Sequence, residues 1–203
     1  MSTLISRRKV ILSLSSLPFL VTSQSANAQA VNTVENAKPF AQTKTWSCWA
    51  AAAVILLRWK DGMNYSELDV ATMAGNKYKN AFTQNTGLLG SDIQDFANKL
   101  GLTTEAPQNF TPGGYESLIK NHGPIWVAAD LGSQGKPRGH VRVLRGVTGD
   151  GTFNGSTAWV LDPDGGHDSQ ITVTQFAQQM EQIARAELDA GGSLYPQVIR
   201  FAG

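Results

Sequence analysis

The spacing of apolar residues changes once along this chain, close to Pro124, and that change limits the folds open to it. Before Pro124, apolar side chains recur every three or four residues, which is the period of an amphipathic helix. After Pro124, β-branched and aromatic residues form short runs bounded by turn residues, as in β-strands. Helices followed by antiparallel strands indicate the α+β class, with an N-terminal helical part packed on a C-terminal antiparallel sheet.

The same patterns predict the bounds of the elements. We expect helices over residues 48–60, from Ser66 for a short stretch, and over 91–100, 113–121 and 174–188. We expect strands over residues 125–129, 140–147, 157–162, 170–173 and 198–201. The segment 75–90 is rich in Gly, Asn, Lys and Thr and is predicted to be a loop. A length of 203 residues, without a repeat or a linker, fits one domain behind a leader.

The start of the chain has the features of a signal peptide. These are a positive start at Arg7, Arg8 and Lys9, an interrupted apolar stretch over residues 10–21, and an A-x-A cleavage site at Ala26–Ala28. The paired arginines resemble a twin-arginine signal, but Val10 stands where Phe is usual, so an ordinary secretory signal stays open. The apolar stretch is too short to span a bilayer, and we expect no stable membrane insertion. We predict a signal peptide over residues 1–28 and an exported domain, periplasmic or secreted, over residues 29–203.

Charge and cysteine content narrow the possible partners. The whole chain has a formal net charge of +1, and loss of the leader would leave the mature domain near −2. No basic run occurs outside the leader, so we expect no nucleic-acid partner. The single cysteine, Cys48, excludes an internal disulfide and a cysteine-cluster metal site. In an oxidising compartment such a thiol is either buried and inert or accessible and used in chemistry.

Cys48 lies where a loop becomes the first predicted helix. Free N–H groups and the positive end of the helix dipole stabilise a thiolate there, which favours a nucleophilic cysteine. Gln42, six residues upstream, carries an amide that could donate a hydrogen bond to a developing oxyanion, with the Cys48 N–H as the second donor.

A nucleophilic thiolate needs a proton partner, and His140 is the best placed histidine. It begins a predicted strand, which is a more rigid platform than the helix end of His122 or the glycine-rich turn of His167. An imidazole also needs an acid or amide to orient it, and Asp162 ends the next strand along the chain. Three other aspartates stay open for this role, namely Asp150, Asp164 and Asp168.

Three motifs in order resemble the papain-like cysteine peptidases. They are Gln-x5-Cys with Ser-Cys-Trp-Ala, then Gly-His-Val-x-Val-x-x-Gly, then Trp-Val-x-Asp-Pro, within residues 40–165. The compact size is similar to two bacterial branches, the avirulence-effector proteases and the leader-peptidase domains of bacteriocin exporters. Thr45 and Trp46 replace the Cys-Gly of the papain signature, and the interval of 92 residues from Cys48 to His140 is shorter than in papain.

The resemblance implies a papain-like fold and a bacterial cysteine endopeptidase acting on a protein or peptide, and the predicted signal peptide implies that the enzyme is exported. It implies that Cys48 is the nucleophile, His140 the general base and acid, Asp162 the orienting acid and Gln42 the oxyanion donor. It implies no cofactor and no metal. The same residues would also serve an acyltransferase, a transglutaminase-like enzyme or a cell-wall amidase, and an inactive secreted binding module stays open. The sequence indicates no oligomeric state.

Several other residues have simpler expected roles. Residues 162–168 are spaced like a calcium loop but lack its terminal Glu, so we expect a solvated turn. We expect the tryptophans at 49, 126 and 159 in the core, and the arginines at 138, 142 and 145 on a solvated strand face.

Overall fold

The computed structural model describes residues 32–132 and 138–202, so the predicted signal peptide lies outside the described residues. Its helices are α1 (Cys48–Asp61), α2 (Glu67–Met73), α3 (Asn76–Thr83), α4 (Ile93–Lys99), α5 (Pro112–His122) and α6 (Val173–Asp189), with a 3-10 turn over Gly90–Asp92. Its strands are β1 (Asn32–Thr33), β2 (Leu102–Thr104), β3 (Ile125–Asp130), β4 (Gly139–Gly149), β5 (Ser156–Asp162), β6 (His167–Thr172) and β7 (Val198–Phe201). Among these residues, no helix is long and apolar enough to cross a membrane.

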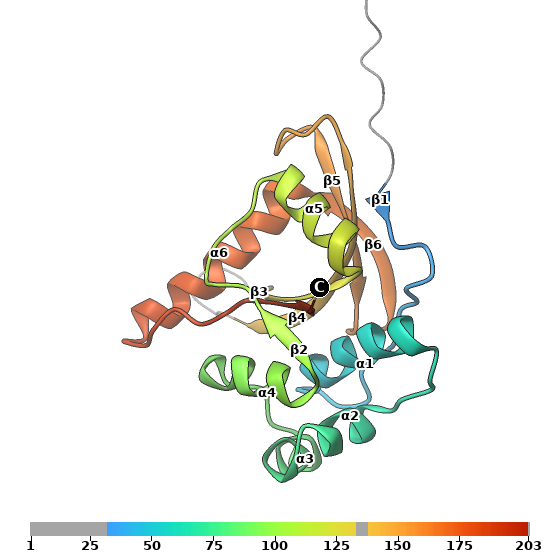
Figure 1. The fold of residues 1–203 in the computed structure, drawn as a ribbon. Helices are drawn as coiled ribbons and strands as arrows, with labels where there is room; N and C mark the ends of the chain where they lie inside the picture. The colour runs from blue at the N-terminus through green and yellow to red at the C-terminus, as the bar shows by residue number, and fades with distance from the viewer. Residues whose placement is uncertain (1–31, 133–137, 203) are drawn as a thin grey trace, which may run out of the picture.

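The strands form one antiparallel sheet in the order β2-β7-β3-β4-β5-β6, with β1 paired to β4. Helices α1 to α4 gather on one side of this sheet in Figure 1, and α5 and α6 lie on the other. The predicted α+β class is therefore confirmed. The helices are not confined to the N-terminal half, because α6 follows β6 and covers the sheet from the far side.

Two hydrophobic cores lie against the two faces of the sheet. Alternation along β3 explains the division, because Trp126 joins the core of α1 whereas Ile125 and Val127 join the core of α5 and α6. A strand that is covered on both faces needs apolar residues at nearly every position, and β3 is buried at all but one of its six residues.

Helix α1 is apolar around its whole circumference, since every residue from Cys48 to Leu57 is buried. The indole N–H of Trp126 donates a hydrogen bond of 3.1 Å to the carbonyl of Trp49 and so joins the sheet to the first turn of the helix. Gly62 ends α1 in the left-handed conformation, at φ 73°, as its position after the last helical residue predicted. The sheet and α1 thereby fix where Cys48 lies.

Four predictions about elements need correction. Segment 75–90 contains helix α3, because its buried Tyr78 and Phe82 form an apolar face that the polar composition obscured. The 3-10 turn includes Ser91, which therefore does not cap α4. Strand β6 begins three residues earlier than predicted, and the short strands β1 and β2 were not predicted. Strands of two or three residues carry too little periodicity to detect, and pairing with longer strands creates them.

Candidate active site

Cys48 is the first residue of α1 and is 8% exposed. At this position a backbone N–H has no partner within the helix, and the positive end of the helix dipole lies next to the side chain. The loop over residues 42–47 leads into it, so the sulfur lies where this loop meets the sheet.

His140 and Asp162 come from neighbouring strands. His140 Nε2 lies 2.6 Å from Asp162 Oδ1. Val143 pairs with Leu161 in the antiparallel register of β4 and β5. Asp162 is therefore opposite Arg142 and diagonally across from His140. The hairpin that turns at residues 149–155 therefore brings together two side chains 22 residues apart.

Cys48 completes this cluster, because its side chain interacts with the His140 ring and lines the same hollow. Because Nε2 faces Asp162, the other ring nitrogen, Nδ1, is left for the sulfur. Burial lowers the pKa of His140, but the hydrogen bonds to Asp162 and Cys48, with the negative charges of both, raise it overall to about 9. The imidazole is consequently protonated at neutral pH.

Asp162 is held as a carboxylate. Burial raises its pKa, but the hydrogen bond from His140 and the charge of that ring outweigh burial. The Asp164 N–H, which donates a 2.9 Å hydrogen bond to Asp162 Oδ1, and the charge of Arg142 lower the pKa further. The pKa of Asp162 therefore lies below its ordinary value of 3.8.

The other titratable candidates have different partners. Asp164 pairs with Arg138 at 2.9 Å, Asp168 pairs with Arg145 at 2.9 Å, and Asp150 accepts hydrogen bonds from Thr152. His122 lies 3.4 Å from Arg200, and His167 begins strand β6. Of the alternatives that the sequence left open, the structure brings Cys48, His140 and Asp162 together.

Gln42 lies near this cluster but directs its amide elsewhere. Its backbone N–H donates to the carbonyl of Pro163, which ties the loop to the end of β5. Its side-chain Nε2 donates to the carbonyls of Lys44 at 2.8 Å and Thr45 at 3.0 Å, while the buried Oε1 has no hydrogen-bond partner in the structure. Both amide hydrogens are thus used within the loop, and its role as an oxyanion donor stays a prediction.

A buried carboxylate that the sequence did not single out fixes the same loop. Glu67, at the start of α2, is 2% exposed and accepts hydrogen bonds from Thr43 N at 3.0 Å, Thr43 Oγ1 and Ser47 Oγ at 2.6 Å. The only signal in the sequence is the capping box that starts α2 at Ser66, and the structure confirms that box. A capping box places a helix start but does not show that its next residue is buried.

The predicted solvated strand face is wrong for two of the three arginines, and both of these lie on β4. Arg142 is 4% exposed and donates a 2.5 Å hydrogen bond to Gln179. Its guanidinium carbon, Cζ, lies 5.7 Å from the ring centroid of Phe176. Its Nε has no hydrogen-bond partner in the structure. Arg145 is 7% exposed and lies over Trp159, which is itself half-buried. Helix α6 and strand β6 cover these side chains, which strand alternation alone could not reveal.

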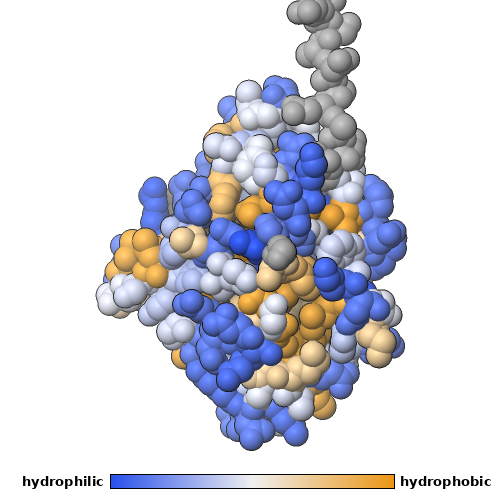
Figure 2. Space-filling view, viewed as in Figure 1, coloured by the Kyte–Doolittle hydropathy of each residue, from blue (hydrophilic) through white to orange (hydrophobic). Residues whose placement is uncertain are grey.

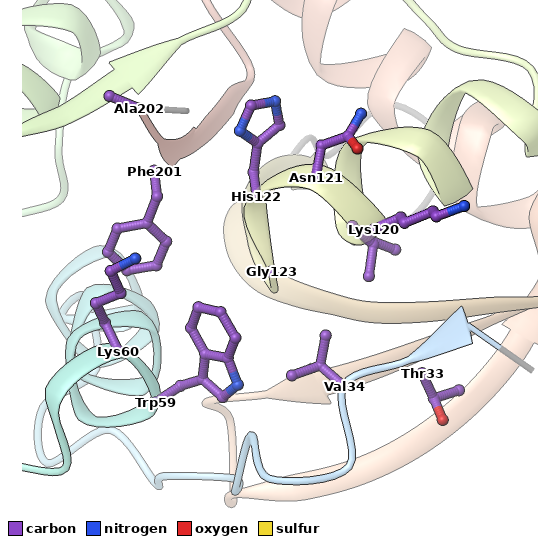
Figure 3. A pocket seen from close by; sticks show the side chains of 11 residues that line it. Thr33, Val34, Trp59, Lys60, Lys120, Asn121, His122, Gly123, Phe201 and Ala202 are labelled. Carbon is purple, nitrogen blue, oxygen red and sulfur yellow. The ribbon is translucent and has the colours of Figure 1, made fainter.

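Two hollows lie at opposite ends of α1. The one beside the cluster, of about 120 Å³, includes Cys48 and His140 among its lining residues. The other lies on a face where apolar side chains gather over α1 (Figure 2), and Trp59 and Lys60 oppose Asn121 and His122 across it (Figure 3). The two share no lining residue.

Within the described part of the chain, no group of three His, Cys, Asp or Glu side chains could hold a metal ion.

A cysteine at the start of a buried helix, facing a histidine–aspartate pair on an antiparallel sheet, defines the class of papain-like cysteine peptidases. The family described as papain-like cysteine protease AvrRpt2 matches residues 28–181. The chain belongs to this family and is a cysteine-type peptidase, which confirms the resemblance seen in its sequence.

Individual solved structures are also similar to the chain. No curated protein matches the chain. Among solved structures it is similar to the Pseudomonas avirulence protein AvrPphB, with 11% sequence identity over 76% of this chain and 89% of that chain, and a TM-score of 0.27.

Proposed function

We propose that this protein is an exported endopeptidase in which Cys48, His140 and Asp162 form the catalytic triad. The observation that carries the proposal is the convergence of these three side chains, with His140 Nε2 2.6 Å from Asp162 Oδ1 and with Cys48 beside the His140 ring in the same hollow. His140 and Asp162 have the protonation states that thiol catalysis needs, because the imidazole is charged at neutral pH and the carboxyl group is ionised.

The mechanism follows from these positions. The Cys48 proton rests on His140 Nδ1, and the thiolate attacks the carbonyl carbon of the scissile peptide bond. The carbonyl oxygen becomes an oxyanion, which the free N–H of Cys48 stabilises. As the C–N bond breaks, His140 passes its proton to the leaving amine and a thioester remains. Water, deprotonated by His140, then hydrolyses the thioester and regenerates the thiol.

Gln42 is the proposed second oxyanion donor, and its geometry sets a condition. To donate to an oxyanion, its amide must release the carbonyl of Lys44 or Thr45, because Nε2 carries two hydrogens and both are engaged. Apo sites often tighten or exchange such hydrogen bonds only when substrate is bound.

Labelling with a peptidyl epoxide that reacts with thiols tests the triad. We expect the wild type to be labelled at Cys48 and to cleave peptides, Cys48→Ala to lose both, and His140→Ala to lose at least about 100-fold of its labelling rate. His122→Ala is the matched control and should behave as wild type, because His122 contacts Arg200 and not the cluster. Equal labelling rates in the wild type and in His140→Ala would exclude His140 as the base.

A further inference from the structure

The hollow beside Cys48 and His140 is mainly apolar. Its walls come from four parts of the fold, namely the start of α1, the loop before α4, the strands β3 and β4, and the last turns of α6. The apolar lining includes Trp46, Leu88, Ile93, Trp126, Val141 and Ile183. Such walls receive the hydrocarbon part of a substrate side chain while its peptide bond lies at the sulfur.

Glu187 is the exception in this lining. It lies on the last turns of α6, is half-buried, and also lines an adjoining hollow that ends at Tyr195 and Gln197. It takes part in none of the ion pairs found among the described residues, whereas Glu181, on the same helix, lies 3.9 Å from Arg185. Glu187 lies beyond residue 181, where the match to the family ends.

The other charged group that lines this hollow is His140, and its charge has partners already. Cys48 and Asp162 both interact with that ring, so the imidazolium is balanced within the cluster. Among the residues that the structure describes, Glu187 is therefore the charged group of the hollow that has no ion-pair partner. A carboxylate beside apolar walls attracts a cation more strongly than it would in open water, and it repels an acidic group.

We propose that this hollow binds a lysine or arginine side chain of the substrate, with its methylene stem on the apolar walls and its charge paired with Glu187. The proposal rests on the proposed peptidase function and adds a substrate class to it. It makes Glu187 a specificity-determining residue, which acts on the choice of substrate and not on the chemistry at the sulfur.

A positional peptide library followed by matched single peptides tests this. We expect the wild type to prefer Arg or Lys at one position near the cleaved bond. At that position, an Arg peptide should have a kcat/KM about tenfold above that of the same peptide with citrulline, which has the same shape but no charge. Glu187→Gln should bring this ratio close to one by lowering the rate for Arg alone, and Glu187→Lys should favour citrulline. Glu181→Gln is the matched control and should keep the wild-type ratio.

Peptidyl epoxides carrying Arg or citrulline give a second readout that does not depend on turnover. The rate of Cys48 labelling should show the same charge preference and the same loss in Glu187→Gln. Cleavage without a charge preference, or an Arg-to-citrulline ratio that Glu187→Gln leaves unchanged, would overturn the role of Glu187 and leave the peptidase intact. If no peptide is cleaved and no peptidyl epoxide labels Cys48, both proposals are overturned.

Discussion

At the scale of single residues, the charge of His140 depends on what surrounds it. Its ordinary pKa of 6.5 rises to about 9 because two anionic neighbours outweigh burial. Since the folded pKa is the higher one, protonation of His140 stabilises the fold fully below pH 6.5, and this contribution is lost as the pH rises through about 9. The charged imidazolium that the active site needs should be lost over the same rise in pH.

We therefore expect kcat/KM of the wild type to fall as the pH rises through about 9. Asp162→Ala removes a hydrogen bond and a charge that raise the pKa of His140, so its alkaline limb should move to lower pH. Asp162→Asn keeps an acceptor without the charge and should shift the limb less. Asp164→Asn, which breaks only the ion pair with Arg138, is the control. The prediction fails if the alkaline limb of Asp162→Ala coincides with that of the wild type.

At the scale of elements, Glu67 couples the loop before Cys48 to α2. In Glu67→Gln an amide N–H₂ replaces one of the two acceptor oxygens, so the hydrogen bonds from Thr43 and Ser47 cannot all form. We expect the free energy of unfolding to fall by about 1–3 kcal/mol. We also expect kcat/KM to fall, because the loop leads directly to the nucleophile.

Ser66→Ala separates these two effects. It removes the cap of α2 and should cost about 1 kcal/mol, but it leaves the contacts to Thr43 and Ser47 in place. Chemical denaturation and peptide hydrolysis should show lower stability with unchanged kcat/KM for Ser66→Ala, and a loss of both for Glu67→Gln. An unchanged kcat/KM in Glu67→Gln would show that Glu67 serves stability alone.

Elements with a long regular pattern were predicted well, whereas helix α3 and the two- and three-residue strands β1 and β2 were not predicted. Helix α1 and strands β3 to β5 carry enough apolar residues to give a clear period, so their bounds agree with the prediction within two residues. Helix α3 has only Tyr78 and Phe82 as buried residues, which is too few for a period among polar neighbours. Its helical state depends on the core that those two rings join.

At the scale of the whole molecule, export is a property that we propose from the leader. When the full chain is made in a bacterial host, we expect the exported form to begin at Gln29 and to carry a net charge near −2. Intact-mass analysis of the periplasmic or secreted fraction checks the cleavage site. Export that stops when Arg7 and Arg8 are both replaced by Lys would assign the twin-arginine route, and unchanged export would assign the ordinary secretory route. Retention of an uncleaved chain in the cytoplasm would contradict the proposal.

The sequence by itself determined the class of fold, the order Cys48, His140, Asp162, and the start of a helix at the cysteine. These are local properties, because the spacing of apolar residues and the start of a helix depend on residues that are neighbours in the sequence. Only the tertiary structure decided which aspartate meets His140, since that depends on the register of β5 against β4 and on the hairpin between them. It alone decided that Glu67 and Arg142 are buried, because the loop before Cys48 covers Glu67 and helix α6 covers Arg142. Contacts between residues 20 to 90 positions apart depend on packing, and packing is a property of the whole chain.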